Sequence, residues 1–265
     1  MSDKPVSLPR YIAFRYVSAG KRSHLVSFMS IISIFGLALG IAILIIVLSV
    51  MNGFDQEMRQ NILGIVPHIT ISSDENLSQA AWDEIESISS QHPDVLSTAP
   101  LIQAMGVAAT AAGNKGVLIN GVDAVAEAET SAIGRFMRSG SIAALQQSKW
   151  GIVIGETLAT RLAVSVGDKI DLFSPAIGMN PLTPLATFRG FELVGVYKVG
   201  SEDLDSNLVM INLAAARALF KIRSPYNALT LRTTDVLQAE KIRVQLDATL
   251  PGDVRTQSWT ATLGS

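Results

Sequence analysis

The longest apolar run of the chain, Ile31–Val50, reads IISIFGLALGIAILIIVLSV, and the stretch from Ser23 to Phe54 contains no Asp, Glu, Lys or Arg. A helix of about 20 apolar residues spans the roughly 30 Å hydrocarbon core of a bilayer. A secretory signal peptide is the alternative, but signal cores run to about 7–15 residues and end at a small-residue cleavage site. This run is longer, and VMNGFDQEMRQNIL after it offers no such site. The pattern therefore predicts a retained transmembrane helix over residues 25–53.

Apolar residues continue at helical spacing beyond this span. Met51, Phe54, Met58 and Ile62 fall three, four and four residues apart, which places them on one face of a continuing helix. Charged and amide side chains occupy most positions between them. We therefore expect an amphipathic stalk over residues 54–65, which stops near the glycine and proline of LGIVP.

From residue 66 onward, short strand and helix patterns alternate. HITISS alternates as a strand, and LSQAAWDEIESISSQ places one set of apolar residues on a single helical face: Leu77, Ala80, Ala81, Ile85 and Ile88. Helices are also expected over residues 156–162 and in AAARALF and VLQAEKIRVQLDATL. Strands are expected in KGVLINGVD, GIVIG, GDKIDLF, FELVGVYKV, NLVMINL, ALTLRTT and VRTQSW. The chain is thus expected to be α+β: one N-terminal transmembrane helix, then a mixed α/β domain over residues 66–265 with two subdomains.

The charge distribution orients the predicted span. Five basic residues precede it against the single acid Asp3, namely Lys4, Arg10, Arg15, Lys21 and Arg22. Basic residues favour the cytoplasmic side, so residues 1–24 are expected in the cytoplasm and the main domain in the periplasm. LPRYIAFRYVSAGKR, with its aromatic and basic residues, suits either a short interfacial helix or a flexible leader. Subtraction from 21 basic and 23 acidic residues leaves 16 and 22 beyond residue 54, which argues against binding to nucleic acid.

The chain carries none of the common catalytic motifs. GxxxxGK[ST], GxSxG and HExxH are absent, there is no cysteine, and three histidines stand far apart: His24, His68 and His92. The acidic cluster SEDLDS lacks the glycine turn and distal glutamate of a calcium loop, so we interpret it as a solvated loop. We therefore expect no enzymatic activity and no metal site in this chain.

Two sets of residues in the predicted span could contact other molecules. Gly36 and Gly40 form a GxxxG spacing, which lets a second helix approach closely. Val47, Val50, Met51 and Phe54 lie at the outer membrane boundary. Apolar side chains there could line a lateral opening for a lipid, or they could make ordinary helix contacts.

The segment SPAIGMNPLTPLATF, residues 174–188, holds three prolines and no charge between two predicted strands. Proline restricts its own backbone and that of its predecessor, so such a loop loses less entropy when a partner orders it. An exposed apolar loop is typical of a binding surface, and the alternative is a loop that folds back onto its own domain. We interpret the segment as a partner-binding loop.

Several motifs together resemble the permease subunits of the bacterial lipoprotein-releasing ABC transporter, the LolC/LolE family. They are LSVMNGFDQEMRQNILGIVPH, LINGVD, VIGETLATRLAVSVGDKIDLFSP and FELVGVYKVGSEDLDSNLVMINLAAARALF, and they cover nearly the whole chain. The resemblance implies a Gram-negative inner-membrane protein whose periplasmic domain is similar to the MacB-type core. The family has four membrane helices, so the chain is expected to be truncated before its second.

The resemblance also implies partners and a task. Two permease subunits, alike or different, would sit on a pair of cytoplasmic ATPase subunits that bind ATP and Mg²⁺, so this chain would carry no cofactor. The complex would extract acylated lipoproteins from the outer leaflet of the inner membrane. It would then pass them to the periplasmic carrier LolA for outer-membrane sorting. Two alternatives stay open: a MacB-like or cell-division-type permease that transmits force, and a single-span anchored binding module.

In LolC-type subunits a protruding hairpin loop, the hook, captures the carrier. GDKIDLFSP places the hook at residues 174–188 of this chain. The resemblance implies carrier contacts by Pro175, Met179, Pro181, Leu182 and Pro184, with Arg189 as a basic support. The family's second basic support falls at Asp171, and a LolE-like subunit has a related loop without the carrier-binding role.

Overall fold

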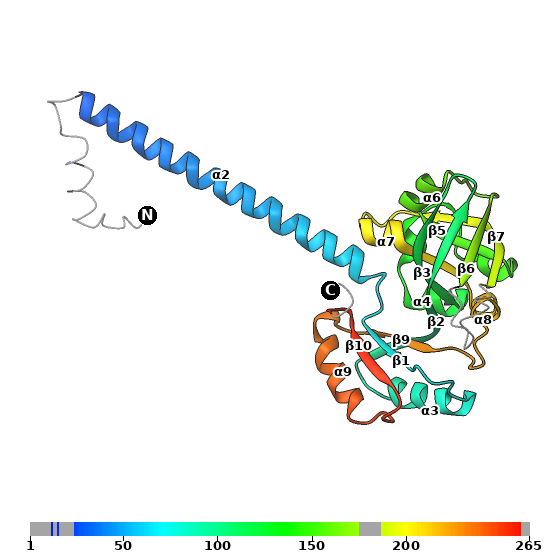
Figure 1. The fold of residues 1–265 in the computed structure, drawn as a ribbon. Helices are drawn as coiled ribbons and strands as arrows, with labels where there is room; N and C mark the ends of the chain where they lie inside the picture. Colours follow the sequence, from blue (N-terminus) through cyan, green and yellow to red (C-terminus); the bar gives the residue numbers. More distant parts are fainter. Residues whose placement is uncertain (1–11, 13–14, 16–23, 175–186, 261–265) are drawn as a thin grey trace, which may run out of the picture. The chain divides into compact units, whose positions relative to one another are not determined.

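The computed structural model describes residues 12, 15, 24–174 and 187–260. The chain forms two compact units, Met1–Met58 and Arg59–Ser265. Figure 1 shows the first unit as a helical segment and the second as a mixture of strands and helices. The mixed α/β character expected from the sequence is thus present in the second unit.

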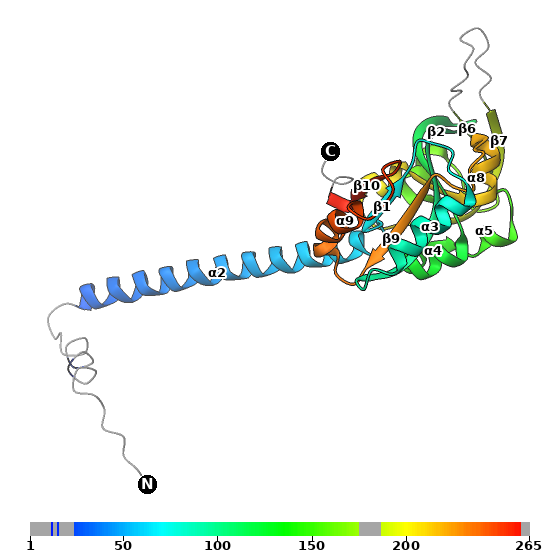
Figure 2. The ribbon, with the colours of Figure 1, turned by 90° about the horizontal axis from the view of Figure 1, so that it is seen from below.

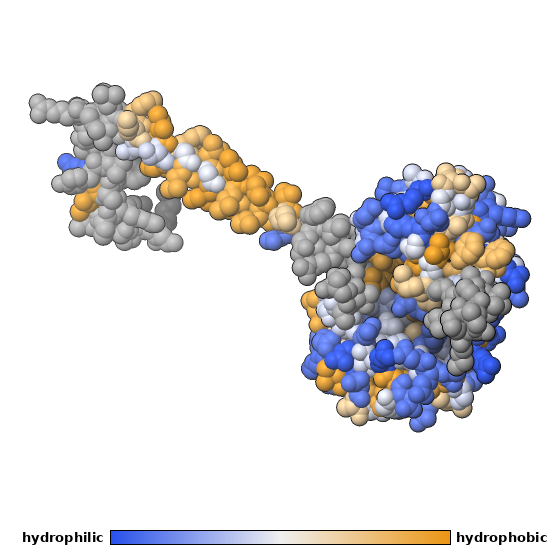
Figure 3. Space-filling model, viewed as in Figure 1, coloured by the Kyte–Doolittle hydropathy of each residue, from blue (hydrophilic) through white to orange (hydrophobic). Residues whose placement is uncertain are grey.

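Helix α2, His24–Leu63, is one uninterrupted helix of 40 residues. In the part of the chain that the structure describes, it contains the one stretch long and apolar enough to span a membrane, Phe28–Gly53. Its side chains from Phe28 to Gly53 are exposed, and Figure 3 shows their surface as almost wholly hydrophobic. The helix continues past the apolar run and ends before Gly64, as the sequence predicts.

Six strands of the second unit pair in a closed ring. The ring runs β2–β3–β8–β5–β7–β6, and β6 closes it by pairing back to β2. The β3–β8 and β5–β7 pairs are parallel and the other four are antiparallel. The six strands are β2 (Val95–Thr110), β3 (Gly113–Val122), β5 (Gly151–Gly155), β6 (Lys169–Ser174), β7 (Thr187–Tyr197) and β8 (Leu208–Asn212). A short strand, β4 (Met137–Gly140), pairs with β7 outside the ring.

A second, antiparallel layer extends from the first half of β2. Its other strands are β9 (Ala228–Thr233), β1 (Ile69–Ser72) and β10 (Arg255–Ser258), in that order. Two helices lie against this layer in Figure 1, α3 (Gln79–Ser90) and α9 (Ala239–Asp247). Trp82 of α3 and Ile242 of α9 enter the same buried cluster as Ile69 and Leu229 of the strands. The strand β2 therefore belongs to both layers.

Short helices connect the strands of the domain. They are α4 (Ala124–Thr130), η1 (Ile133–Phe136), α5 (Ala144–Gln147), α6 (Glu156–Leu162), α7 (Glu202–Asn207), α8 (Leu213–Phe220) and η2 (Val236–Gln238). Two glycines in the strands allow α7 and α8 to pack closely against the sheet. A Cβ on Gly121 would lie 2.2 Å from Cβ of Ala216 in α8, and one on Gly155 would lie 2.2 Å from the carbonyl oxygen of Asp205 in α7. Only glycine leaves room at these contacts.

The strands and helices predicted from the sequence are present, but the sequence pattern did not predict β2 or the four short elements over residues 124–147, which are α4, η1, β4 and α5. The 16-residue strand β2 was not predicted, because its apolar residues do not alternate, Pro100 interrupts the run, and the register shifts between Val95 and Ser97. The buried face of α3 was assigned incorrectly in part. Trp82 is fully buried at its centre, whereas Ala80, which the sequence placed on that face, is exposed.

Candidate functional site

The most distinctive feature of the second unit is the β6–β7 hairpin. The two strands pair from Lys169 with Glu192 to Ser174 with Thr187, and Figure 2 shows their ends side by side. The predicted hook residues Pro175, Met179, Pro181, Leu182 and Pro184 lie in the segment 175–186, outside the described residues. The loop boundaries predicted from the sequence, 174–188, are too wide, because Ser174, Thr187 and Phe188 belong to the strands.

One face of the hairpin is apolar and exposed near its end. The rings of Phe173 and Phe188 stack with centroids 5.5 Å apart and an interplanar angle of 22°. Val107 of β2 pairs with Phe173, so three strands contribute to this face. Phe188 is 62% exposed. Paired residues point to the same side of a sheet, so Val107, Phe173 and Phe188 share one face of it.

The opposite face of the hairpin carries the predicted basic support, Arg189. Its guanidinium carbon lies 4.4 Å from the ring centroid of Trp150. Trp150 in turn contacts the edge of Phe191, with centroids 5.5 Å apart at 78°. No sequence motif predicted a role for Trp150, whose only local signal is an aromatic residue before a buried strand. The structure therefore places Arg189 on an aromatic support at the base of the hairpin.

The residues predicted to contact acyl chains lie on α2. Val47, Val50 and Met51 are exposed, and the side chain of Phe54 lies outside the described part of the chain. Gly36 and Gly40 have open space beside their Cα atoms. Val47, Val50 and Met51 are thus not buried by the described part of the chain, and their contact with acyl chains stays a prediction.

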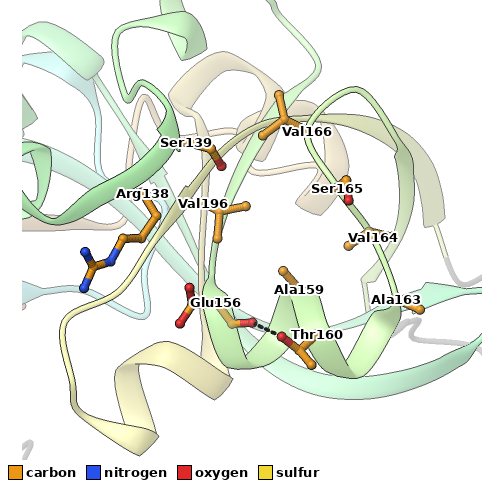
Figure 4. A pocket seen from close by; sticks show the side chains of 10 residues that line it. All are labelled: Arg138, Ser139, Glu156, Ala159, Thr160, Ala163, Val164, Ser165, Val166 and Val196. Atoms are coloured by element: carbon orange, nitrogen blue, oxygen red, sulfur yellow. Dashed lines mark hydrogen bonds between the residues drawn. The ribbon is translucent and has the colours of Figure 1, made fainter.

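A hollow of about 620 Å³ lies among β4, α6 and β7. Figure 4 shows Arg138 and Glu156 toward one side of it and Val164 and Ser165 toward the other. Glu156 pairs with Lys198 at 2.6 Å, and this hydrogen bond lowers the pKa of the Glu156 carboxyl. Small and aliphatic side chains thus line the hollow, with the ion-paired Glu156 at its edge.

The acidic cluster at residues 201–206 is not a solvated loop, so the sequence interpretation was wrong. It forms α7, and Asp205 is only 4% exposed. Its two carboxylate oxygens accept hydrogen bonds from the backbone N–H groups of Val199, at 2.8 Å, and Gly200, at 2.9 Å. A carboxylate that accepts two backbone hydrogen bonds holds the turn in its folded conformation.

The hydroxyl of the buried Tyr197 lies next to the same helix. It donates to the carbonyl oxygens of Leu204 and Leu208, and burial raises the pKa of this tyrosine.

Two of the histidines have structural partners. Nδ1 of His68 lies 2.9 Å from the Thr233 hydroxyl, and Nε2 of His92 lies 3.0 Å from the Gln245 side-chain oxygen. The carbonyl oxygen of His68 accepts a hydrogen bond from the Trp259 N–H at 3.0 Å. His68 and Trp259 therefore tie together the first and last strands of the domain.

One carboxyl group of the domain has a strongly shifted pKa. Burial raises the pKa of Glu127, on α4, to about 7, and a hydrogen bond with Ser131 opposes this shift. The N–H of Ala132, directly after Ser131, donates to the carbonyl oxygen of Gly64 at 2.8 Å. Glu127 therefore lies close along the chain to Ala132, whose backbone hydrogen-bonds to Gly64 near the start of the domain.

We expect Glu127→Gln to abolish a pH dependence of domain stability. The folded state holds the proton more tightly than the unfolded state, so stability is greatest below the ordinary value of 4.5 and falls as pH rises through about 7. The variant should be more stable than the wild type by about 3 kcal/mol at about pH 8 and similar to it near about pH 4.5. Denaturant unfolding followed by tryptophan fluorescence measures this, because all three tryptophans lie in the domain. Parallel pH profiles of the two proteins would contradict the assignment.

Comparisons with known proteins agree with this fold. The family model of the MacB-like periplasmic core domain matches residues 30–249. The chain is 30% identical to the lipoprotein-releasing system transmembrane protein LolC of Neisseria meningitidis serogroup B, over 96% of this chain and 60% of that protein. It is 26% identical to LolE of Haemophilus influenzae, over 98% of this chain and 63% of that protein. The chain thus spans about three fifths of the length of these curated relatives.

A solved structure is also similar. The periplasmic region of MacB from Actinobacillus actinomycetemcomitans aligns with a TM-score of 0.46 and 13% identity, over 78% of this chain and 96% of that one. The resemblance drawn from the sequence motifs to the lipoprotein-releasing permeases is confirmed by the sequence matches.

Proposed function

The chain belongs to the family of MacB-like periplasmic core domains, and on that premise we propose that it is the permease subunit of an ATP-driven lipoprotein-releasing transporter. Its similarity to LolC and LolE over most of its length supports this assignment. In this role it is a non-catalytic membrane subunit. A separate cytoplasmic ATPase binds ATP and Mg²⁺, and a second permease subunit, alike or different, completes the membrane part.

The membrane helix supports the proposed location in the bacterial inner membrane. The basic residues before it favour a cytoplasmic N-terminus and a periplasmic domain. Val47, Val50, Met51 and Phe54 contact the acyl chains of a lipoprotein at the outer boundary of the span. Gly36 and Gly40 pack against a helix of the same complex, because the absence of side chains lets two helices approach closely.

The β6–β7 hairpin is the observation that carries the carrier-binding role. Paired strands position both ends of an uncharged, proline-rich segment, residues 175–186. The segment acts as a hook that receives a LolA-type periplasmic carrier, through Pro175, Met179, Pro181, Leu182 and Pro184. Its prolines reduce the entropy lost on binding, and its apolar side chains are buried when the carrier docks.

The test replaces Met179 and Leu182 together with Asp in the membrane-embedded protein and measures its affinity for the carrier. We expect at least about a 100-fold loss, because two charges would have to be buried in an apolar interface. Leu237→Asp is the matched control, since Leu237 is 71% exposed on η2 and should leave binding unchanged. Wild-type affinity in the double variant would overturn the hook assignment.

The family match also favours a second candidate, a MacB-like or cell-division-type permease that transmits force and moves no lipid. A single-span anchored binding module is a third. Co-purification of radiolabelled acylated lipoprotein with the assembled complex distinguishes the first candidate from the other two. Lipoprotein that fails to co-purify would favour force transmission or anchoring.

A further inference from the structure

The hollow of about 620 Å³ beside α6 has two walls and an apolar floor. Arg138 and Ser139 of β4 form one wall, and Val164, in the turn after α6, forms part of the other. The floor consists of Ala159 and Val196, which are 6% and 8% exposed. Figure 4 shows these two side chains and that of Val164 directed into the space between the walls, with Arg138 toward one end. We refer to this site as the β4–α6 hollow.

Both walls of the hollow are fixed by backbone hydrogen bonds. The N–H of Val164 donates to the carbonyl oxygen of Ala159 at 3.0 Å, which folds the turn back onto α6. The N–H of Gly167 donates to the carbonyl oxygen of Leu193 at 2.8 Å, which ties the same turn to β7. The opposite wall, β4, is itself paired with β7. The shape of the hollow is therefore largely set before a ligand arrives, and a preformed site loses less entropy on binding.

The hollow lies at the opposite end of the β6–β7 hairpin from the segment 175–186. The turn of the hollow leads into Lys169, the first residue of β6, and Val196 is next to the last residue of β7. The segment 175–186 follows Ser174 at the other end of β6, about 17 Å along the strand at about 3.3 Å per residue. A ligand in the hollow would thus contact a surface separate from the loop that joins β6 and β7.

The lining of the hollow combines aliphatic side chains with serine hydroxyls. Val166 at the rim is 47% exposed, although it is aliphatic. The hydroxyls of Ser139 and Ser165 have no hydrogen-bond partner within the described ranges of the chain. An acyl chain would cover these hydroxyls without bonding to them, which costs free energy. A peptide instead supplies an aliphatic side chain together with backbone N–H and C=O groups.

One cation at the end of the hollow has no ionic partner. Glu156 is paired with Lys198 at 2.6 Å. The hydrogen bond from Lys198 lowers the pKa of the Glu156 carboxyl, and the charge of Arg138 adds to this effect, so the carboxylate is ionised at neutral pH. Arg138 itself makes no ion pair in the part of the chain that the structure describes. The end of the hollow thus carries two cations against one carboxylate, and the excess charge favours a ligand with a carboxylate.

We propose that the β4–α6 hollow binds an acidic, aliphatic segment of another polypeptide. In this arrangement the aliphatic side chain packs on Ala159 and Val196. The peptide backbone bonds to the hydroxyls of Ser139 and Ser165, and the carboxylate pairs with Arg138. The apolar contact contributes affinity, and the matched geometry of guanidinium and carboxylate contributes specificity. The inference does not depend on the proposed function, because no observation that supports it comes from the membrane span or from the hairpin loop.

The experiment uses an introduced thiol as a local reporter, since the chain contains no cysteine. Val166→Cys places one thiol at the rim of the hollow. Val244→Cys, on α9, is the matched control, because Val166 and Val244 are 47% and 53% exposed. Each membrane-embedded variant is treated with the peptide Asp-Leu-Asp that carries a pyridyl disulfide, and the thiopyridone released by exchange is followed by its absorbance.

The rates are normalised to those with the uncharged pyridyl disulfide of mercaptoethanol, which removes differences in thiol reactivity. We expect Val166→Cys to react with Asp-Leu-Asp at least about tenfold faster than Val244→Cys, because binding raises the local concentration of the probe. The peptides Asn-Leu-Asn and Asp-Gly-Asp should each lose about fivefold of this advantage, since one lacks the carboxylates and the other lacks the aliphatic side chain.

Two substitutions in the Val166→Cys protein connect this preference to the hollow. Arg138→Gln should remove the preference for Asp-Leu-Asp over Asn-Leu-Asn, whereas Arg161→Gln, which replaces an exposed cation of α6 outside the lining, should keep it. Ser139→Trp should slow the reaction with Asp-Leu-Asp about tenfold, because the indole fills the hollow from an exposed position and leaves the core unchanged.

Three results would overturn the proposal. They are equal normalised rates at the two thiols, a preference for acidic peptide that survives Arg138→Gln, and a pyridyl octyl disulfide that reacts faster than Asp-Leu-Asp at the rim thiol. The last result would assign the hollow to acyl chains. Carrier binding enters none of these measurements, so a failure of the proposed function and a failure of this inference are distinguishable.

Discussion

Asp205→Ala is expected to lower the free energy of unfolding of the domain by about 3–5 kcal/mol. The carboxylate is buried and accepts two backbone hydrogen bonds, from Val199 and Gly200. Alanine would leave both N–H groups without these partners, in a turn where Gly200 already has a positive φ of 90°. Chemical unfolding followed by tryptophan fluorescence measures the loss.

The matched control for this variant is Asp203→Asn in the same acidic cluster. Asp203 is exposed and accepts a hydrogen bond only from the Asn207 side chain, so its replacement should change stability by less than about 0.5 kcal/mol. Asp205→Asn should fall between the two, because an amide retains one acceptor oxygen. Equal stability of the Asp205 and Asp203 variants would show that the carboxylate does not brace the turn.

Trp82→Ala should cost about 3–5 kcal/mol, the range for removal of a buried tryptophan. Trp82 is fully buried, its ring lies 4.8 Å from that of Tyr226, and its Nε1–H donates to the Ser224 hydroxyl at 3.1 Å. The substitution would leave a cavity beneath α3 and remove a partner of Ser224. Hydrogen exchange should show the greatest loss of protection in β1 and β9, which share its core cluster.

Trp82→Phe separates packing from the hydrogen bond. It keeps most of the buried ring and loses the N–H donor, so we expect a smaller cost of about 1–2 kcal/mol. Leu96→Ala serves as the surface control, since Leu96 is 62% exposed and its truncation should be nearly neutral. If Trp82→Ala were as mild as Leu96→Ala, Trp82 would not be central to the core that joins α3 to the sheet.

The two stability predictions concern different parts of the domain. Asp205 braces the turn before α7, beside the strand ring, whereas Trp82 lies under α3 against the layer of β1, β9 and β10. The long strand β2 belongs to both layers. We therefore expect destabilisation of either layer to spread to the other through this shared strand.

For the candidate site, the sequence predicts the two strands of the hairpin but not the contact between Arg189 and Trp150. GDKIDLF and FELVGVYKV predict two strands around a proline-rich segment, and β6 and β7 occupy these positions. The alternation of buried and exposed residues along each strand is a local property. The contact between Arg189 and Trp150 is not local, because Trp150 precedes β5 and meets Arg189 only through the parallel pairing of β5 with β7.

The acidic cluster at residues 201–206 is a feature that sequence reasoning predicted incorrectly. A run of acids between strands is usually solvated, because burial of a charge is costly unless it is hydrogen-bonded. Here two N–H groups of a turn compensate Asp205, and Gly155 leaves room for the backbone of α7 to approach. Composition alone cannot predict such compensation, since the donors depend on the shape of the preceding turn and the space comes from Gly155 of β5, far earlier in the chain.

The sequence by itself determined the long apolar helix α2, the periods of most strands and helices, and the uncharged proline-rich segment between β6 and β7. These features follow from physical properties that act within one segment: the length needed to cross a bilayer, the repeat of a strand or helix, and the restricted backbone of proline. Only the tertiary structure decided that β6 closes the ring onto β2, that Asp205 is buried, and that Trp150 supports Arg189. These depend on pairing between segments far apart in the chain, which local periodicity does not encode.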